Sequence, residues 1–154
     1  MKFIGHLDIM RYFQKAIRRA DIDIAYSEGF SPHMIMSFAA PLGVGLTSEG
    51  EYVDLQVNSC ASSKAAVDAL NSVMVDGMEV VSFKLLPETV KNAMASVAAA
   101  DYFVNFREGY APENWEEKFM AFLQKDEMLI VKKTKRSEAE VDLKPMLYKA
   151  EIRD

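Results

Sequence analysis

The sequence predicts an α+β fold, built from two ferredoxin-like (βαββαβ) halves in tandem, each with helices packed on an antiparallel sheet. Three observations lead to this prediction. Apolar residues alternate with polar ones in several short segments, helical apolar stripes lie between these segments, and the order of elements in residues 1–90 resembles that in residues 91–154. On this plan we expect the chain to be trimmed at both ends, because much of a first strand and a last helix and strand are missing.

The composition favours a packed apolar core and excludes several classes of protein. Half of the 154 residues are hydrophobic and 27% are charged, as in globular proteins. The single cysteine, Cys60, excludes an internal disulfide and a thiolate cage for zinc or an iron–sulfur cluster, which needs about three or four cysteines. No apolar run approaches the roughly 20 residues that cross a bilayer. We therefore expect a cytoplasmic chain that has no membrane contact and holds no cofactor or metal.

In the first half, periodicity indicates two helices and several strands. Apolar residues at helical spacing, among them Phe13 and Ile17, predict a helix over residues 7–20. Strict alternation around Val53 and Leu55 predicts a strand over residues 51–57. The other predicted elements of this half are extended segments at 22–26, 35–39 and 80–86, a turn-rich connection at 27–33 and a helix at 59–74.

The second half follows a small-residue stretch at residues 92–100, which marks the boundary between the halves. Pro112 suits the first turn of a helix, and Trp115, Phe119 and Phe122 give that helix an apolar face. Strands are predicted at residues 99–106, 128–133 and 148–153.

A basic stripe on the first helix is the strongest sign of binding. Arg11, Lys15 and Arg18 repeat at helical spacing, with Arg19 and Tyr12 beside them. Cations contact phosphate, and an aromatic ring among guanidinium groups can stack on an unpaired base. The net charge of −5 argues against a protein that grips nucleic acid over its whole surface. The alternative is a solvated helix face whose cations pair with nearby carboxylates, namely Asp21, Asp23 or Glu28.

The two histidines, His6 and His33, are the only imidazoles available for acid–base chemistry. If the fold brings them together, a metal-independent ribonuclease could use the pair. The alternative is that each ring makes a local hydrogen bond at a helix entrance or a turn. The carboxylates Glu51 and Asp54 fall on opposite faces of the predicted strand, so we expect no metal site there.

Residues 2–54 contain several ordered blocks, which are KFIGHLD at 2–8, RRA at 18–20, AYSEGFSPH at 25–33, SF at 37–38, PLGVG at 41–45 and SEGEYVD at 48–54. These blocks closely resemble the bacterial radical-SAM-linked protein family, a domain of unknown function. The resemblance is dense over the first third of the chain and looser beyond residue 60. It implies a radical SAM protein as partner, and the iron–sulfur cluster and S-adenosylmethionine are expected on that partner and not on this chain.

A fainter similarity links residues 26–32 and 37–38 to the CRISPR repeat-processing endoribonucleases, which pair two ferredoxin-like folds and bind RNA. One departure bears on it. Family members usually continue Pro-His-Pro and then a basic residue, whereas this chain has Met34 and Ile35 after His33. A cation that would face phosphate is therefore absent from the loop.

We expect this chain to bind or assist and not to catalyse by itself, as an accessory domain that recognises RNA for a radical SAM enzyme, with transfer RNA as the first candidate. The four cations of the stripe would contact phosphate. The loop would shape the pocket through Tyr26, Ser27, Gly29, Phe30 and Pro32. Two alternatives stay open: the metal-independent ribonuclease using His6 and His33, and a structural domain that docks through its sheet edges or through Met34 and Met36.

Overall fold

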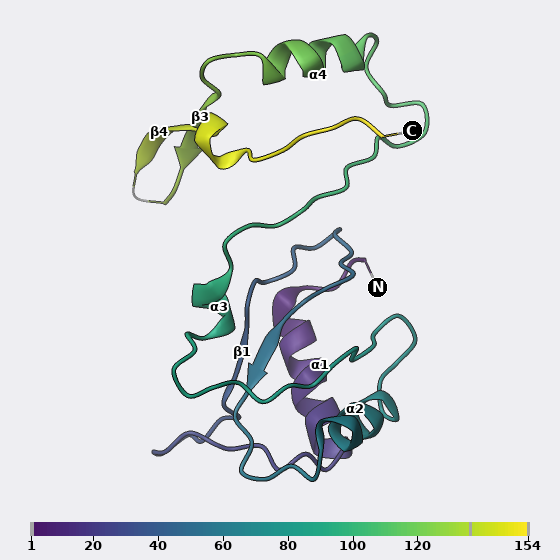
Figure 1. Ribbon diagram of the computed structural model, residues 1–154, viewed down its shortest axis with the longest axis vertical. Coiled ribbons are helices and arrows are strands. Elements are labelled where there is room, and N and C mark those ends of the chain that lie inside the picture. The colour runs from purple at the N-terminus through teal and green to yellow at the C-terminus, as the bar shows by residue number, and fades with distance from the viewer. Residues whose placement is uncertain (1, 136, 154) are drawn as a thin grey trace. The chain divides into compact units, whose positions relative to one another are not determined.

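The computed structural model describes residues 2–135 and 137–153 and has a mixed α+β architecture with two small antiparallel sheets (Figure 1). This architecture agrees with the predicted α+β class. The chain divides into two compact units, unit 1 over Met1–Asp101 and unit 2 over Tyr102–Asp154. That residues 1–90 and 91–154 repeat one ferredoxin-like plan stays a prediction. The sequence also has a second basic run, formed by Lys132, Lys133, Lys135 and Arg136. Its last member, Arg136, lies outside the described residues.

Unit 1 contains helix α1 (His6–Arg19), strands β1 (Met36–Phe38) and β2 (Val53–Leu55), and helices α2 (Ser63–Asn71) and α3 (Ala93–Ser96). Unit 2 contains helix α4 (Trp115–Leu123), strands β3 (Leu129–Lys133) and β4 (Glu138–Asp142), and the 3₁₀ helix η1 (Lys144–Met146). Across both described stretches of chain, every helix is too short or too polar to cross a bilayer.

Helix α1 confirms the helix predicted at residues 7–20. Asp8 lies in its first turn, and Arg18 and Arg19 lie in its last turn. This arrangement places negative charge near the free N–H groups and positive charge near the free carbonyls, which favours the helix at both ends. The chain then turns away through Asp21, which has a positive φ of 51°.

The core of unit 1 lies where α1 and α2 meet the extended segments between them. Its buried members are Ile17 of α1, Leu70 of α2, and Ile24 and Met34 of the extended segments. Half-buried aliphatic residues, including Leu55 of β2, pack around them. Helices α1 and α2 and the two extended segments each contribute a buried apolar side chain to this cluster, so the core holds together segments that are far apart in sequence.

A closed set of backbone hydrogen bonds joins three extended segments beside this core. Ala25 N–H donates to the Gln56 carbonyl (2.7 Å), Gln56 N–H donates to the Ile35 carbonyl (3.0 Å), and Ile35 N–H donates to the Ala25 carbonyl (2.9 Å). We call this set the three-way junction. Strands β1 and β2 continue from it as an antiparallel pair, in a register that sets Ser37 opposite Asp54.

Helix α2 is shorter than the helix predicted at residues 59–74. It begins after Ser62, whose side chain accepts from the Ala65 N–H at 3.0 Å. The side chain of Asn71 at its end binds both backbone groups of Val80, accepting from the N–H at 2.8 Å and donating to the carbonyl at 3.0 Å. A side-chain amide thus supplies Val80 with the partners that a neighbouring strand would supply.

Four segments predicted as strands do not form strands. Residues 22–26 make only two isolated bridges, Ile24 with Val57 and Tyr26 with Met34. The other three segments that form no strand are residues 80–86, 99–106 and 148–153. Alternation favours an extended path, but a strand also needs a backbone alongside to complete its hydrogen bonds. Residues 138–142, which alternate charged and aliphatic side chains, form β4 instead.

In unit 2, strands β3 and β4 form a hairpin in which Val131 lies opposite Glu140. The Asp142 carboxylate accepts from the N–H groups of Met128 (2.7 Å) and Lys144 (2.9 Å), which closes the open end of the hairpin. These two backbone donors stabilise the charged form and lower the pKa of Asp142. Lys144 Nζ donates to the Leu123 carbonyl at 2.6 Å, which ties η1 to the end of α4.

Replacing Ile17 with Ala should lower the free energy of unfolding by about 2–5 kcal/mol, because a fully buried side chain leaves a cavity that only partly closes. Urea denaturation followed by circular dichroism measures this change. The matched control is Leu7→Ala on the same helix, where the side chain is 63% exposed and the expected change is within about 0.5 kcal/mol. Equal costs for the two variants would contradict the location of the core.

Candidate functional site

The basic stripe of α1 is exposed, but its members have different surroundings. Arg11, Lys15 and Arg18 are all exposed, and Arg11 makes an exposed ion pair of 3.3 Å with Asp8. Such a pair contributes little to stability, so the guanidinium stays available to a ligand. Arg19 instead donates from Nη2 to the carbonyl of Val73 (3.4 Å), which directs it toward the end of α2.

Tyr12, predicted as a stacking residue, has a contact within the domain. Its hydroxyl accepts from the Val75 N–H at 2.8 Å and lies 3.4 Å from the sulfur of Met74. Its ring meets Phe13 edge to face, with centroids 6.0 Å apart. The ring is half-buried, and these contacts hold the chain after α2 against α1. Whether Tyr12 also meets a base stays a prediction.

The loop at residues 27–33 is a hairpin closed by contacts at its base. Ser27 N–H donates to the His33 carbonyl (2.9 Å), and His33 N–H donates to Ser27 Oγ (3.1 Å). Ser27 Oγ also lies 2.8 Å from His33 Nδ1. Gly29 has a φ of 106°, which side chains rarely adopt, so the turn requires glycine there. We call Ser27 and His33 with these contacts the clasp.

Phe30 stands at the tip of this hairpin and is fully exposed. Burying a phenylalanine side chain is worth about 1.5–3 kcal/mol, so a ligand that covers this ring would gain binding energy from the contact. Pro32 limits the backbone freedom of the same loop. The predicted loop residues Tyr26, Ser27, Gly29, Phe30 and Pro32 are therefore brought together on one short hairpin.

A polar hollow connects the loop to the basic stripe. Arg18 from α1 and Tyr26 from the start of the loop both line it, together with Asp23 and Ser59. The Asp23 carboxylate accepts from Asn58 Nδ2 (2.9 Å) and Ser59 Oγ (2.7 Å). These bonds lower the pKa of Asp23, so the hollow carries a fixed negative charge beside the Arg18 cation.

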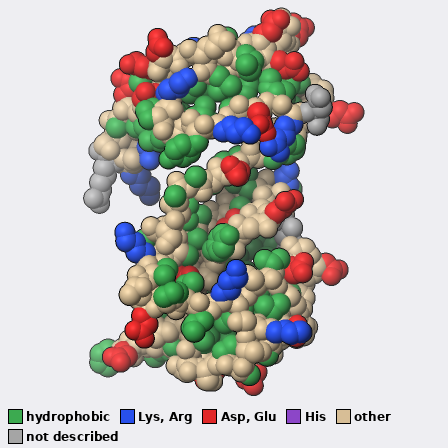
Figure 2. Space-filling model, viewed as in Figure 1, with side chains coloured by type: hydrophobic (Ala, Val, Ile, Leu, Met, Phe, Trp, Pro, Cys, Tyr) green, Lys and Arg blue, Asp and Glu red, His purple; other side chains and the backbone are tan. Residues whose placement is uncertain are grey.

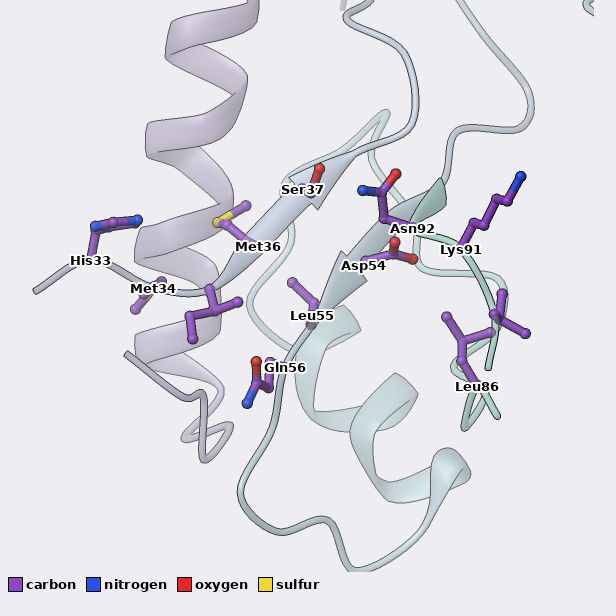
Figure 3. A pocket seen from close by; sticks show the side chains of 12 residues that line it. His33, Met34, Met36, Ser37, Asp54, Leu55, Gln56, Leu86, Lys91 and Asn92 are labelled. Carbon is purple, nitrogen blue, oxygen red and sulfur yellow. The ribbon is translucent and has the colours of Figure 1, made fainter. Parts of the chain in front are cut away.

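An open groove of about 390 Å³ runs from the other side of the loop across β1 and β2 (Figure 3). His33 lies at one end, and Lys91 and Asn92 lie at the other. Met36 and Leu55 line it between these ends. The Asp54 carboxylate at the groove accepts from the Ala93 N–H at 2.6 Å. Met34 also borders the groove but is buried, as expected for a residue that fills a core gap.

The two histidines have separate partners. The His6 ring meets Phe38 edge to face at 5.4 Å, and Phe38 meets Phe13 in the same way at 5.4 Å. His33 belongs to the clasp with Ser27. Within residues 2–135 and 137–153, the contacts of the two imidazoles go to different partners, and none joins one ring to the other. Their roles in catalysis stay predictions.

Electrostatically, the two units carry intermixed charges. On the face shown in Figure 2, acidic and basic side chains alternate and no broad basic field covers either unit. Where side chains are described, no group of three or more His, Cys, Asp or Glu residues is arranged to hold a metal ion.

Sequence reasoning missed the polar hollow and the Asp54 contact. Asn58 and Ser59 lie 35 and 36 residues after Asp23 in the sequence, so local spacing gives no sign that they contact it. The only available signal was that Asp23 interrupts an otherwise apolar segment between Ile22 and Ile24. Asp23 is exposed, so water could solvate its carboxylate, and this position alone does not require a partner from elsewhere in the fold.

Residues 1–154 match the sequence model of a family described as an uncharacterized protein conserved in bacteria (DUF2344). No curated protein and no solved structure matches the chain.

Replacing Ser27 with Ala should loosen the loop without unfolding unit 1. It removes the acceptor of the His33 N–H, a bond worth about 0.5–1.5 kcal/mol, so amide exchange at His33 should accelerate about 2- to 10-fold. Amide exchange measured by NMR on the full chain tests this. Ser31→Ala in the same loop is the control, since its side chain makes no hydrogen bond in the described structure. Equal exchange rates in the two variants would show that the clasp does not hold the loop.

Proposed function

The chain belongs to this family of uncharacterized bacterial proteins, and we propose that it is an accessory domain that recognises RNA for a radical SAM enzyme. The observation that supports RNA recognition is the polar hollow where Arg18 of the basic stripe meets Tyr26 of the closed loop. Phosphate would bind along the exposed face of α1, and an unpaired base would stack on Phe30 or Tyr26.

The energetics of this surface fit selective and moderate binding. Three cations on one helix face provide few phosphate contacts, and Asp23 beside Arg18 repels a phosphate that enters the hollow too deeply. Binding would therefore depend on bases at the loop as well as on charge. Such an arrangement favours single-stranded or loop regions of RNA, whose bases are free to stack, over a regular duplex.

The wider proposal follows the family resemblance of residues 2–54. A radical SAM protein would be the partner and would hold the iron–sulfur cluster and S-adenosylmethionine, while this chain presents the RNA, with transfer RNA as our first candidate. The fold would then be tandem ferredoxin-like, and the site of action would be the cytoplasm. Cys60 is the single cysteine of the chain and is exposed, so the chemistry of a cluster would belong to the partner.

RNA binding should depend on salt through the stripe. With three phosphate contacts, log Kd against log salt should have a slope of about 2 for single-stranded RNA. The variant Arg11→Ala, Lys15→Ala, Arg18→Ala should bring the slope near zero, whereas Arg19→Ala should change it less because that side chain is directed toward Val73. Fluorescence anisotropy of labelled RNA at several salt concentrations measures this, with DNA of the same sequence for comparison.

The control for the stripe removes equal charge elsewhere on the chain. Lys64→Ala, Lys84→Ala, Lys125→Ala takes away three exposed cations that are not on α1. It should leave the slope close to that of the unmodified chain. If both triple variants flatten the slope alike, binding follows net charge and not the stripe. If the unmodified chain binds no RNA, the proposed function is wrong.

The clasp favours one second candidate, metal-independent RNA cleavage. With Nδ1 held 2.8 Å from Ser27 Oγ, the ring of His33 has a fixed direction and leaves Nε2 for another group. Nε2 would accept the proton of a ribose 2′-hydroxyl while the 2′-oxygen bonds to phosphorus. The 5′-oxygen would leave and take a proton from water, which gives a cyclic phosphate and a 5′-hydroxyl.

This candidate predicts RNA cleavage in the presence of EDTA that His33→Ala abolishes. Ser27→Ala should lower the rate less, because it removes the contact that orients the ring and not the base itself. His6→Ala should leave cleavage unchanged, since His6 contacts Phe38 and not the loop. Denaturing gel electrophoresis of labelled RNA measures the rates. Cleavage by all three variants at the full rate would indicate a contaminating nuclease and exclude this role.

A further inference from the structure

The polar hollow of unit 1 has room for a nucleobase. Its volume is about 560 Å³, within the roughly 300–1,000 Å³ of sites that take small ligands. The charged residues of its lining are Arg18, Asp21 and Asp23, so two carboxylates oppose one cation. This balance of charge disfavours a phosphate in the interior and favours a neutral group that donates hydrogen bonds.

The Asp23 carboxylate at this hollow is held in place and still has acceptor sites to offer. One oxygen accepts from Asn58 Nδ2 at 2.9 Å, and the other accepts from Ser59 Oγ at 2.7 Å. An ionised carboxylate has about four lone-pair sites, so each oxygen can accept one further hydrogen bond. Because Asp23 is exposed and lines the hollow, it presents two adjacent acceptors in a fixed position to a ligand there.

Arg18 and Tyr26 supply the other contacts that a nucleotide needs at this hollow. Over the two described stretches of chain, the Arg18 guanidinium makes no ion pair, so it is available to the phosphate of a nucleotide whose base enters the hollow. Tyr26 is 46% exposed, and its ring can stack on the base. Stacking accepts every base, because each has a π-face. A choice among bases must therefore come from hydrogen bonds, and Asp23 is the group placed to make them.

Guanine is the RNA base whose hydrogen-bonding edge matches a carboxylate. Its Watson–Crick edge carries two adjacent donors, the N1–H group and the N2 amino group, one for each carboxylate oxygen. Adenine and cytosine have a single amino donor on this edge, beside a ring nitrogen whose lone pair the carboxylate repels. Uracil has one N–H group between two carbonyl oxygens. Only guanine therefore pairs with both oxygens of Asp23 at once, and such bidentate pairs give the strongest discrimination between bases.

We propose that the polar hollow selects guanine among the unpaired bases of RNA, with Asp23 as the residue that determines this specificity. Asp23 accepts from the Watson–Crick edge of the base, Tyr26 stacks on its ring, and Arg18 contacts the phosphate of the same nucleotide. The inference rests on the RNA recognition proposed above and names the base that is read. It assigns Asp23 a role beyond repelling phosphate, because the same carboxylate that excludes an anion binds a pair of donors.

Base analogues test this choice on the unmodified full chain. Fluorescence anisotropy is measured with labelled oligouridine that carries one central guanine, adenine or cytosine, or uridine throughout. The guanine RNA should bind about 5-fold tighter or more than the others. Inosine, which lacks the N2 amino group, should lose most of this preference, whereas 7-deazaguanine, which keeps the Watson–Crick edge, should retain it.

The outcomes separate this inference from the proposed function. Equal affinity for all four RNAs would overturn the selection of guanine and leave RNA recognition standing, whereas binding of none of them would overturn both. An equal loss with inosine and with 7-deazaguanine would contradict reading of the Watson–Crick edge. Guanosine monophosphate presents the same edge, so it is added as a competitor. Displacement of the RNA at micromolar concentrations would assign the hollow to a free nucleotide and overturn recognition of guanine within RNA.

Two matched variants test the role of Asp23. Asp23→Asn replaces one acceptor oxygen with an amino group, so the preference for guanine over adenine should fall close to 1. Asp21→Asn removes the same charge from the same hollow, and asparagine tolerates the positive φ of 51° at that position. The Asp21 side chain makes no hydrogen bond in the described structure, so this control should keep the preference. A preference that survives Asp23→Asn, or that both variants lose alike, would overturn the assignment to Asp23.

Discussion

The rest of unit 1 depends on the three-way junction of Ala25, Ile35 and Gln56. Each N–H and carbonyl in this closed set has a partner in another segment, so none of the three segments can shift without breaking bonds to both others. The junction fixes where residues 22–26 leave α1, and therefore places Tyr26 at the hollow lined by Arg18. It also sets the base of the loop that carries Phe30 and the strands that form the groove.

Much of unit 1 is stabilised by side chains that act as backbone partners. Asn71 binds both backbone groups of Val80, Asp54 accepts from Ala93, and Tyr12 accepts from Val75. Asp142 does the same for Met128 in unit 2. Asn71 in this way holds the segment around Val80 in place without a neighbouring strand. The RNA recognition proposed for unit 1 uses the surface around Arg18 and Tyr26, which these contacts leave exposed.

Local periodicity was enough to predict α1, β2 and the core position of Ile17, because each signal lies within one element. It also identified the loop with Phe30, since turn residues mark it directly. It failed where a distant partner decides the outcome. Residues 148–153 alternate but have no strand beside them, whereas residues 138–142 pair across a turn with β3. The hydrogen bonds of Asp23 with Asn58 and Ser59, and those of Asn71 with Val80, form only in the folded chain. Sequence spacing alone therefore does not predict them.

The division into two units has a consequence for synthesis of the protein on the ribosome. The core of unit 1, from Ile17 to Leu70, and the three-way junction lie wholly within the earlier part of the chain. At roughly 5–20 residues per second, translating residues 102–154 takes about 3–10 seconds after unit 1 is complete. Helices and hairpins form in microseconds, so this interval is long enough for the first unit to fold while the second is still being made. Strands β3 and β4 are therefore synthesised after the core of unit 1 has had time to form.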